Sequence, residues 1–128
     1  MKSPFLLALV ISCSAISCED KIGQQIQAIF TKNMDLEKET ATKMEELIQF
    51  RNKINVQGRA LTEDEISLVE EMDAAEKRWQ DWGKAFHARD LIHVEEKDRE
   101  AFLEEQHKLY SDLKILHSDI EGMLSSPF

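Results

Sequence analysis

The chain has 128 residues, enough for one domain. Charged residues make up 32% of it and hydrophobic residues 42%, with four Gly and two Pro, a composition that suits a water-soluble helical protein and argues against a disordered tail or a sheet with frequent turns. The formal net charge of −9 argues against nucleic acid and anionic lipid headgroups as direct partners, because like charges repel.

Residues 1–17 have the composition of a secretory signal peptide. Lys2 supplies a positive start, residues 5–11 form an unbroken apolar run, and small residues follow up to Cys18. The run is too short for a membrane-spanning helix. We therefore expect residues 1–17 to be removed and residues 18–128 to form the helical domain. An N-terminal helix packed into the core is the alternative.

Cys18 is the candidate lipidation site. Ala15, Ile16 and Ser17 precede it in an order that resembles the bacterial lipobox, in which the cysteine is acylated and becomes the first residue. Acyl chains would hold the protein at a lipid bilayer, since each buried methylene contributes about 0.8 kcal/mol. Cys13 stands in a similar context with a shorter apolar run before it. Cleavage by an ordinary signal peptidase, which would release a secreted protein, is the alternative outcome.

The first helix is expected over about residues 20–55. Apolar residues recur along it at steps of three and four: Ile22, Ile26, Ile29, Phe30, Met34, Ala41, Met44, Leu47, Ile48 and Ile54. Asn33, Glu37 and Thr40 interrupt this pattern, so a break near Lys32 into two shorter helices is an alternative to one long helix.

The first connection is well marked. Residues 55–58, Asn-Val-Gln-Gly, supply a helix stop with side chains that tolerate a positive φ. Thr62 and Glu65 then have the spacing of a capping box, and acidic residues around them lie at the positive end of the helix dipole. Leu61 and Ile66 stand at the two positions of a hydrophobic staple.

The second helix carries an apolar face that consists of Ile66, Val69, Met72, Ala75, Trp79, Trp82 and Phe86. The large side chains of Trp79, Trp82 and Phe86 form either a hydrophobic groove for a ligand or peptide or the bulky end of the core. Gly83 favours the core, because a glycine there would let a neighbouring helix approach closely. The helix has no clear end, and we place the second connection at residues 87–93.

The third helix has the most regular pattern. Its apolar seam steps by four and three along Phe102, Gln106, Leu109, Leu113, Leu116, Ile120 and Met123. A second stripe, Leu103, Tyr110, His117 and Leu124, widens the buried face enough for two partner helices. The helix is expected to end near Leu124, ahead of Pro127. Short connections make neighbours antiparallel, so the expected fold is all-α, an antiparallel up-down-up three-helix bundle with coiled-coil-like packing. A helical hairpin that dimerises is the alternative.

The sequence contains no recognisable catalytic constellation. It has no Gly-x-Ser-x-Gly, no cysteine beyond Cys18 and no glycine-rich phosphate loop, so we expect neither enzyme activity nor a cofactor. Glu104 and His107 have the Glu-x-x-His spacing of di-iron bundles. The heptad frame turns both toward solvent, and we therefore expect no metal site. His117, on the flanking stripe, is expected to be partly buried and hydrogen-bonded.

The segment Trp-Gln-Asp-Trp-Gly-Lys-Ala-Phe at residues 79–86, and Phe-Leu-Glu-Glu-Gln at residues 102–106, support a family comparison. They resemble the small helical lipoproteins of Bacteroidetes that are labelled "viral A-type inclusion protein". The resemblance covers most of residues 18–124. It implies a lipidated leader and a helical bundle, and it implies no reaction. Gly83 stands where that family commonly has Met, and Phe102 where it has Tyr.

These observations predict a non-enzymatic lipoprotein of the bacterial cell envelope. Acylated Cys18 would anchor it to the outer membrane, on the periplasmic or the surface face, and it would act on an unknown envelope protein through protein–protein contacts. One alternative is a periplasmic helical chaperone or stress sensor, because residues 61–65 resemble the Leu-Thr-x-x-Gln signature of such chaperones. A second alternative is a secreted soluble helical binding protein. A homo-oligomer is compatible with each of these functions.

Overall fold

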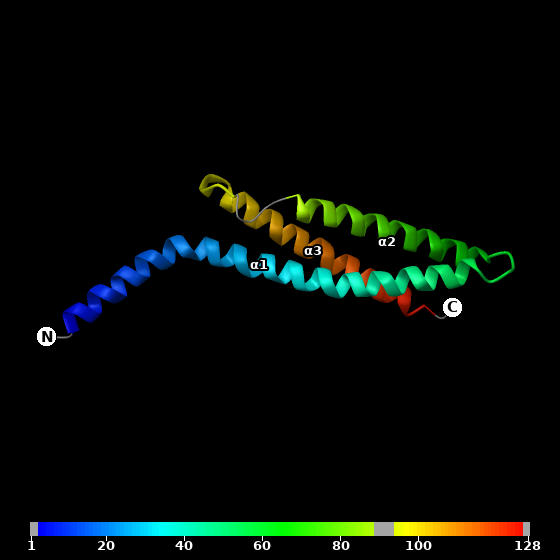
Figure 1. The fold of residues 1–128 in the computed structure, drawn as a ribbon, viewed down its shortest axis with the longest axis horizontal. Coiled ribbons are helices and arrows are strands. Elements are labelled where there is room, and N and C mark those ends of the chain that lie inside the picture. The colour runs from blue at the N-terminus through cyan, green and yellow to red at the C-terminus, as the bar shows by residue number, and fades with distance from the viewer. Residues whose placement is uncertain (1–2, 89–93, 127–128) are drawn as a thin grey trace.

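The computed structural model describes the backbone of residues 3–88 and 94–126 and the side chains of residues 21–88 and 94–126. Helix α1 spans Ser3–Asn55, α2 spans Glu63–His87, a 3-10 helix η2 spans Glu96–Asp98, and α3 spans Arg99–Leu124. Helices α1 and α3 run in the same direction and α2 runs antiparallel to them (Figure 1). The described residues therefore form the all-α up-down-up three-helix bundle that the apolar periodicities predict.

Helix α1 is continuous. It begins at Ser3 rather than near residue 20, since the apolar run of residues 5–11 consists largely of residues that tolerate a helix well, Leu and Ala among them. It has no break near Lys32, so the alternative of two shorter helices is wrong. The N-terminal part of α1 runs on past the other two helices (Figure 1). Among the described side chains, the first buried one is that of Ile26.

The seam of α3 is confirmed. Its buried residues are Phe102, Gln106, Leu109, Leu113, Leu116 and Ile120. Met123 is partly buried at the edge, and the flanking stripe from Leu103 to Leu124 is partly buried as well. Helix α3 packs most extensively against α1 and to a smaller extent against α2. The chain therefore covers the seam of α3 with two of its own helices, rather than forming a two-helix hairpin.

The buried face of α2 starts one residue earlier than the apolar pattern predicts. Glu65 and Leu68 are buried, whereas Ile66 is 45% exposed and Val69 is only partly buried. From Met72 onward the prediction is confirmed: the buried residues are Met72, Ala75, Trp82 and Phe86, and Trp79 is partly buried. The shift arises because the carboxylate of Glu65 finds polar partners at the start of the helix.

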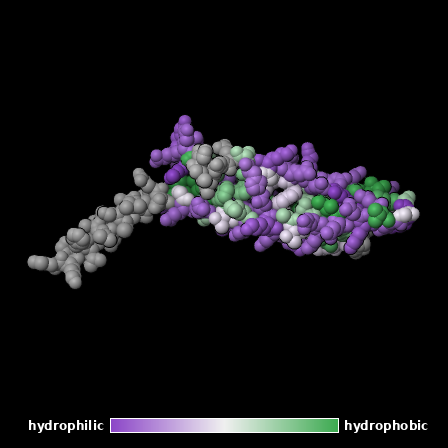
Figure 2. Space-filling view, in the orientation of Figure 1, coloured by the Kyte–Doolittle hydropathy of each residue, from purple (hydrophilic) through white to green (hydrophobic). Residues whose placement is uncertain are grey.

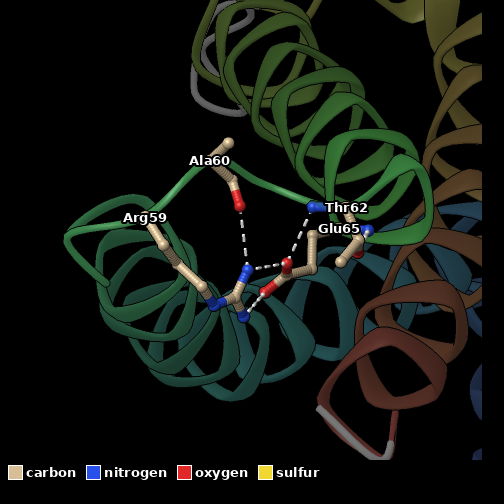
Figure 3. A network of polar contacts seen from close by, with 4 residues as sticks. All are labelled: Arg59, Ala60, Thr62 and Glu65. Carbon is tan, nitrogen blue, oxygen red and sulfur yellow. Dashed lines mark hydrogen bonds and ion pairs between the residues drawn. The ribbon is translucent and has the colours of Figure 1, made fainter.

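Those partners lie in the α1–α2 connection (Figure 3). The Thr62 Oγ1 accepts a hydrogen bond from the Glu65 N–H at 3.1 Å, and a Glu65 carboxylate oxygen accepts one from the Thr62 N–H at 2.9 Å, which confirms the capping box. Arg59 donates to the two Glu65 carboxylate oxygens at 2.7 and 3.0 Å and to the Ala60 carbonyl at 3.0 Å. The Arg59 guanidinium and the Thr62 N–H lower the pKa of Glu65 to about 2. Gly58 has a φ of 70°, as a helix-ending glycine requires.

Gly83 does not serve close helix packing. A Cβ at this position would meet no atom within 4 Å, so the expectation that Gly83 admits a neighbouring helix of this chain is wrong. The neighbouring aromatic side chains fill the space between α2 and the other helices instead.

The surface is polar over most of the face seen in Figure 2, with hydrophobic residues scattered between the polar ones.

Ion pairs connect the helices at several points. The Arg51 guanidinium lies 2.7 Å from a carboxylate oxygen of Asp73 and 2.6 Å from one of Glu76. Burial opposes protonation of Arg51, but its hydrogen bonds and charge interactions with Glu76 and Asp73 outweigh burial and raise its pKa. This cluster joins α1 to α2.

Candidate functional site

Two fully buried polar residues of α1 lie in the seam that it shares with α3. Asn33 and Thr40 are 0% exposed, although their polarity breaks the apolar pattern, whereas the apolar Met34 is 41% exposed. The Asn33 Nδ2 donates hydrogen bonds to the Gln106 backbone carbonyl at 3.0 Å and to the Gln106 Oε1 at 2.9 Å. The Asn33 Oδ1 and the Gln106 Nε2 have no hydrogen-bond partner among the described residues. This amide pair holds α1 in register with α3, as buried polar residues do in coiled coils.

Thr40 forms the second buried polar contact. Its hydroxyl donates to the Leu36 carbonyl at 2.7 Å and lies 3.1 Å from the Nδ1 of His117, whose Nε2 lies 2.7 Å from a Glu121 carboxylate oxygen. The expectation that His117 is partly buried and hydrogen-bonded is confirmed. A hydroxyl, an imidazole and a carboxylate in series resemble a nucleophile, base and orienting group. Thr40 is fully buried, and its contact with His117 joins α1 to α3.

The aromatic residues singled out by the sequence form a stack. Phe86 lies between Phe30 of α1 and Trp82, with ring centroids 5.0 and 4.9 Å apart, and Trp79 stacks on Trp82 at 6.0 Å. The indole N–H of Trp82 donates to the Leu109 carbonyl of α3 at 2.8 Å. Trp82 and Phe86 are therefore core residues, with Trp79 at the core's edge. A ligand groove formed by these three residues stays a hypothesis.

An open groove of about 330 Å³ lies between α2 and α3. Its floor is apolar and consists of Trp82, Ala85, Leu109, Ile115 and Leu116. Arg78, Asp81 and Asp112 stand at its rim. Of the aromatic residues that the sequence suggested for a groove, Trp82 alone is among the described residues that line this one. Ile115 is 57% exposed, and an isoleucine on the polar side of the third helix is the sequence signal that could have located the groove.

A metal site needs at least three ligand side chains close together. No group of three His, Cys, Asp or Glu side chains among residues 21–88 and 94–126 could hold a metal ion. Glu104 and His107 are exposed, as the heptad frame predicts. The Nε2 of His87 lies 2.6 Å from a Glu37 carboxylate oxygen, which places α2 against α1 near the end of the bundle.

The predicted lipidation site lies within α1. The backbone of Cys18 is helical, and its side chain is outside the described residues. None of the helices, over the residues that the structure describes, has the length and apolar character needed to cross a bilayer.

Comparisons with known proteins add no family. No family model, no curated protein and no solved structure matches the chain. The described residues show an all-α three-helix bundle with an open groove between α2 and α3. The resemblance to the Bacteroidetes lipoproteins stays a prediction.

Proposed function

We propose that this protein is a lipid-anchored helical bundle of the bacterial cell envelope that acts through protein–protein contacts. The observation that carries the proposal is the leader: a positive start, an apolar run and small residues ending at Cys18, directly ahead of an acidic helical domain. Acylation of Cys18 supplies the anchor, and the outer membrane is the proposed location.

The continuity of α1 supports this function. Cys18 and Ile26, the first buried side chain described, belong to one uninterrupted helix. At 1.5 Å per residue the distance along the helix between them is about 12 Å. A lipid on Cys18 would thus hold the bundle close to the bilayer through a short helical connection rather than a long flexible linker.

The enclosed polar groups support a role other than catalysis. The Asn33 amide and the Thr40 hydroxyl are fully buried and bonded to α3 or to their own helix, where a substrate cannot reach them. The α2–α3 groove is an open feature of the surface, and its apolar floor and charged rim are typical of surfaces that bind other proteins.

Metabolic labelling with an alkyne analogue of palmitate tests the anchor. We expect the protein expressed in a bacterial host to carry the label and to fractionate with membranes, and we expect Cys18→Ser to abolish both. Cys13→Ser is the matched control and should change neither. If Cys13→Ser loses the label and Cys18→Ser keeps it, the acylated residue is Cys13. Absence of label from all three proteins would favour a secreted protein and overturn the proposal.

A further inference from the structure

The groove between α2 and α3 consists of more than one hollow. A second hollow continues along the same two helices and includes Glu71, Ala74, Gly122 and Met123 in its lining. Arg78 borders both hollows. No described residue of α1 lines either hollow, so α1 covers one side of the α2–α3 pair and the groove lies on a side that α1 leaves open. From residue 71 to residue 85 of α2 the groove extends for about 21 Å, or four helical turns.

The walls of the groove include several small residues. Ala85 and Ala74 contribute small side chains from α2, and Gly122 contributes none from α3. A Cβ at Gly122 would meet no atom within 4 Å, so packing within the chain does not require a glycine there. Ile115 is 57% exposed, and Trp82 and Leu116 line the groove beside it. A partner helix would remove this apolar surface from water.

The charged residues that line the groove are mostly acidic. Four carboxylates line the two hollows, namely those of Glu71, Asp81, Asp112 and Asp119, against the single guanidinium of Arg78. Arg78 is paired with Asp119 at 2.9 Å, whereas Asp81 and Asp112 make no ion pair or side-chain hydrogen bond with another described residue. Lys108, one turn before Asp112 on α3, is not among the residues that line the groove. The groove thus combines an apolar floor with a negative rim.

We propose that the α2–α3 groove binds an amphipathic helix of a partner protein, with the apolar face of that helix covering Ile115 and its Lys or Arg side chains facing Asp81 and Asp112. This inference rests on the proposed function and specifies the contact surface. The partner would complete a four-helix arrangement by the helix-in-groove mode. A second copy of this chain fits poorly, because it brings the same net charge of −9 to an acidic rim.

Peptide titration tests the groove. The probes are two fluorescein-labelled amphipathic peptides of about 18 residues, long enough to cover the groove as a helix, one built from Leu and Lys and the other from Leu and Glu in the same pattern. The protein is the full chain with Cys18→Ser, so that the outcome does not depend on acylation. We expect the Leu/Lys peptide to bind and the Leu/Glu peptide not to bind.

Matched variants separate the groove from general attraction to an acidic protein. Ile115→Gln should weaken binding about tenfold by removing the apolar contact. Ile66→Gln, at an isoleucine of similar exposure outside the groove, should change it less than about twofold. Likewise Asp81→Asn with Asp112→Asn should weaken binding about fivefold or more. Glu70→Gln with Glu104→Gln, which removes one exposed carboxylate from each of the same helices outside the groove lining, should have little effect.

The indole N–H groups give a second readout. In a ¹H–¹⁵N spectrum, the Leu/Lys peptide should shift the Trp82 indole signal, since Trp82 lines the groove, more than that of Trp79. Trp79→Phe assigns the two signals. Equal binding by all variants, or no binding of the Leu/Lys peptide, would overturn the groove as a docking site. If the chain self-associates and Ile115→Gln abolishes that self-association, the occupant of the groove is a second copy of this chain, and the proposal of a different partner protein is overturned. Each of these results leaves the palmitate result for the anchor unaffected.

Discussion

Replacing Asn33 and Gln106 by Leu, singly and together, measures how much the buried amide pair contributes to the stability of the bundle. Both residues are 0% exposed, and the Asn33 Nδ2 donates to two acceptors of Gln106, its backbone carbonyl and its Oε1. One buried atom of each amide already lacks a hydrogen-bond partner among the described residues. The pair therefore combines two hydrogen bonds with two desolvated polar atoms.

The two single substitutions should lower the free energy of unfolding by different amounts. Asn33→Leu removes both hydrogen bonds and leaves the whole Gln106 amide buried without a partner, so we expect a loss of about 2 kcal/mol in the free energy of unfolding. Gln106→Leu removes one hydrogen bond, and Asn33 keeps its bond to the backbone carbonyl, so the expected loss is about 1 kcal/mol or less. In the double variant no buried amide remains. Its stability should equal or exceed that of the parent, as happens when buried polar groups are replaced together by apolar ones.

Urea unfolding followed by far-UV circular dichroism gives these free energies, provided that the m-value is unchanged. Asn33→Leu should be the least stable of the four proteins, and the double-mutant cycle should give a coupling energy of at least about 1 kcal/mol. If the two single losses add up in the double variant, the amides do not interact as described. Analytical ultracentrifugation of the double variant tests the second role of the pair, because loss of register should produce mixed oligomers.

Three further predictions concern single positions. Gly83→Ala should raise the free energy of unfolding by about 1 kcal/mol, because the glycine lies inside α2 with open space at its Cβ; Gly58→Ala, at a positive φ, should lower it, and urea unfolding measures both. Leu113→Asp places a carboxylate at a site of 0% exposure and should abolish the helical circular dichroism signal. His107→Ala, at an exposed site, should leave that signal unchanged. If the protein tolerates both substitutions equally, the heptad frame is wrong. The pKa of Glu65 is about 2 in the folded protein, against an ordinary value of 4.5. Between these pH values the unfolded state therefore binds more protons than the folded state. The stability that the Glu65 carboxylate supplies should be lost as the pH falls from about 4.5 to 2. Melting temperatures measured across this range should fall more steeply for the parent than for Glu65→Gln.

The sequence predicts best where burial and hydrophobicity coincide. The seam of α3 from Phe102 to Ile120 is predicted residue by residue, since five of its six buried positions are large apolar side chains. The capping box at Thr62 and Glu65 is predicted because both partners lie within four residues of each other. The glycine turn at Gly58 is equally local in origin. Such features depend on neighbouring residues alone.

Contacts between distant residues explain what the sequence misses. Asn33 and Thr40 read as interruptions of the α1 stripe, yet they are buried because Gln106 and His117, more than seventy residues further along the chain, offer polar partners. A pattern based on hydrophobicity alone assigns Met34 to the core in their place. Glu65 is missed on α2 for a different reason. Its partners Arg59 and Thr62 are close in the sequence, but a pattern of apolar residues assigns no buried position to a carboxylate.

The groove is partly visible in the sequence. Ile115 stands among polar neighbours on the outer side of the third helix, which is a signal in itself. Asp81 and Ala85 come from α2, however, and their position opposite Asp112 depends on how the two helices pack. The sequence suggested either a groove or the bulky end of the core for Trp79, Trp82 and Phe86. In the structure Phe86 is a core residue, and Trp82, also in the core, lines the α2–α3 groove.

Mass spectrometry of the mature N-terminus shows whether the protein begins at a lipid-modified Cys18. We expect the purified protein to lack residues 1–17 and to begin at Cys18 with a diacylglyceryl group on its sulfur. A chain that begins near Glu19 without lipid, or one that retains residues 1–17, would contradict the anchored function.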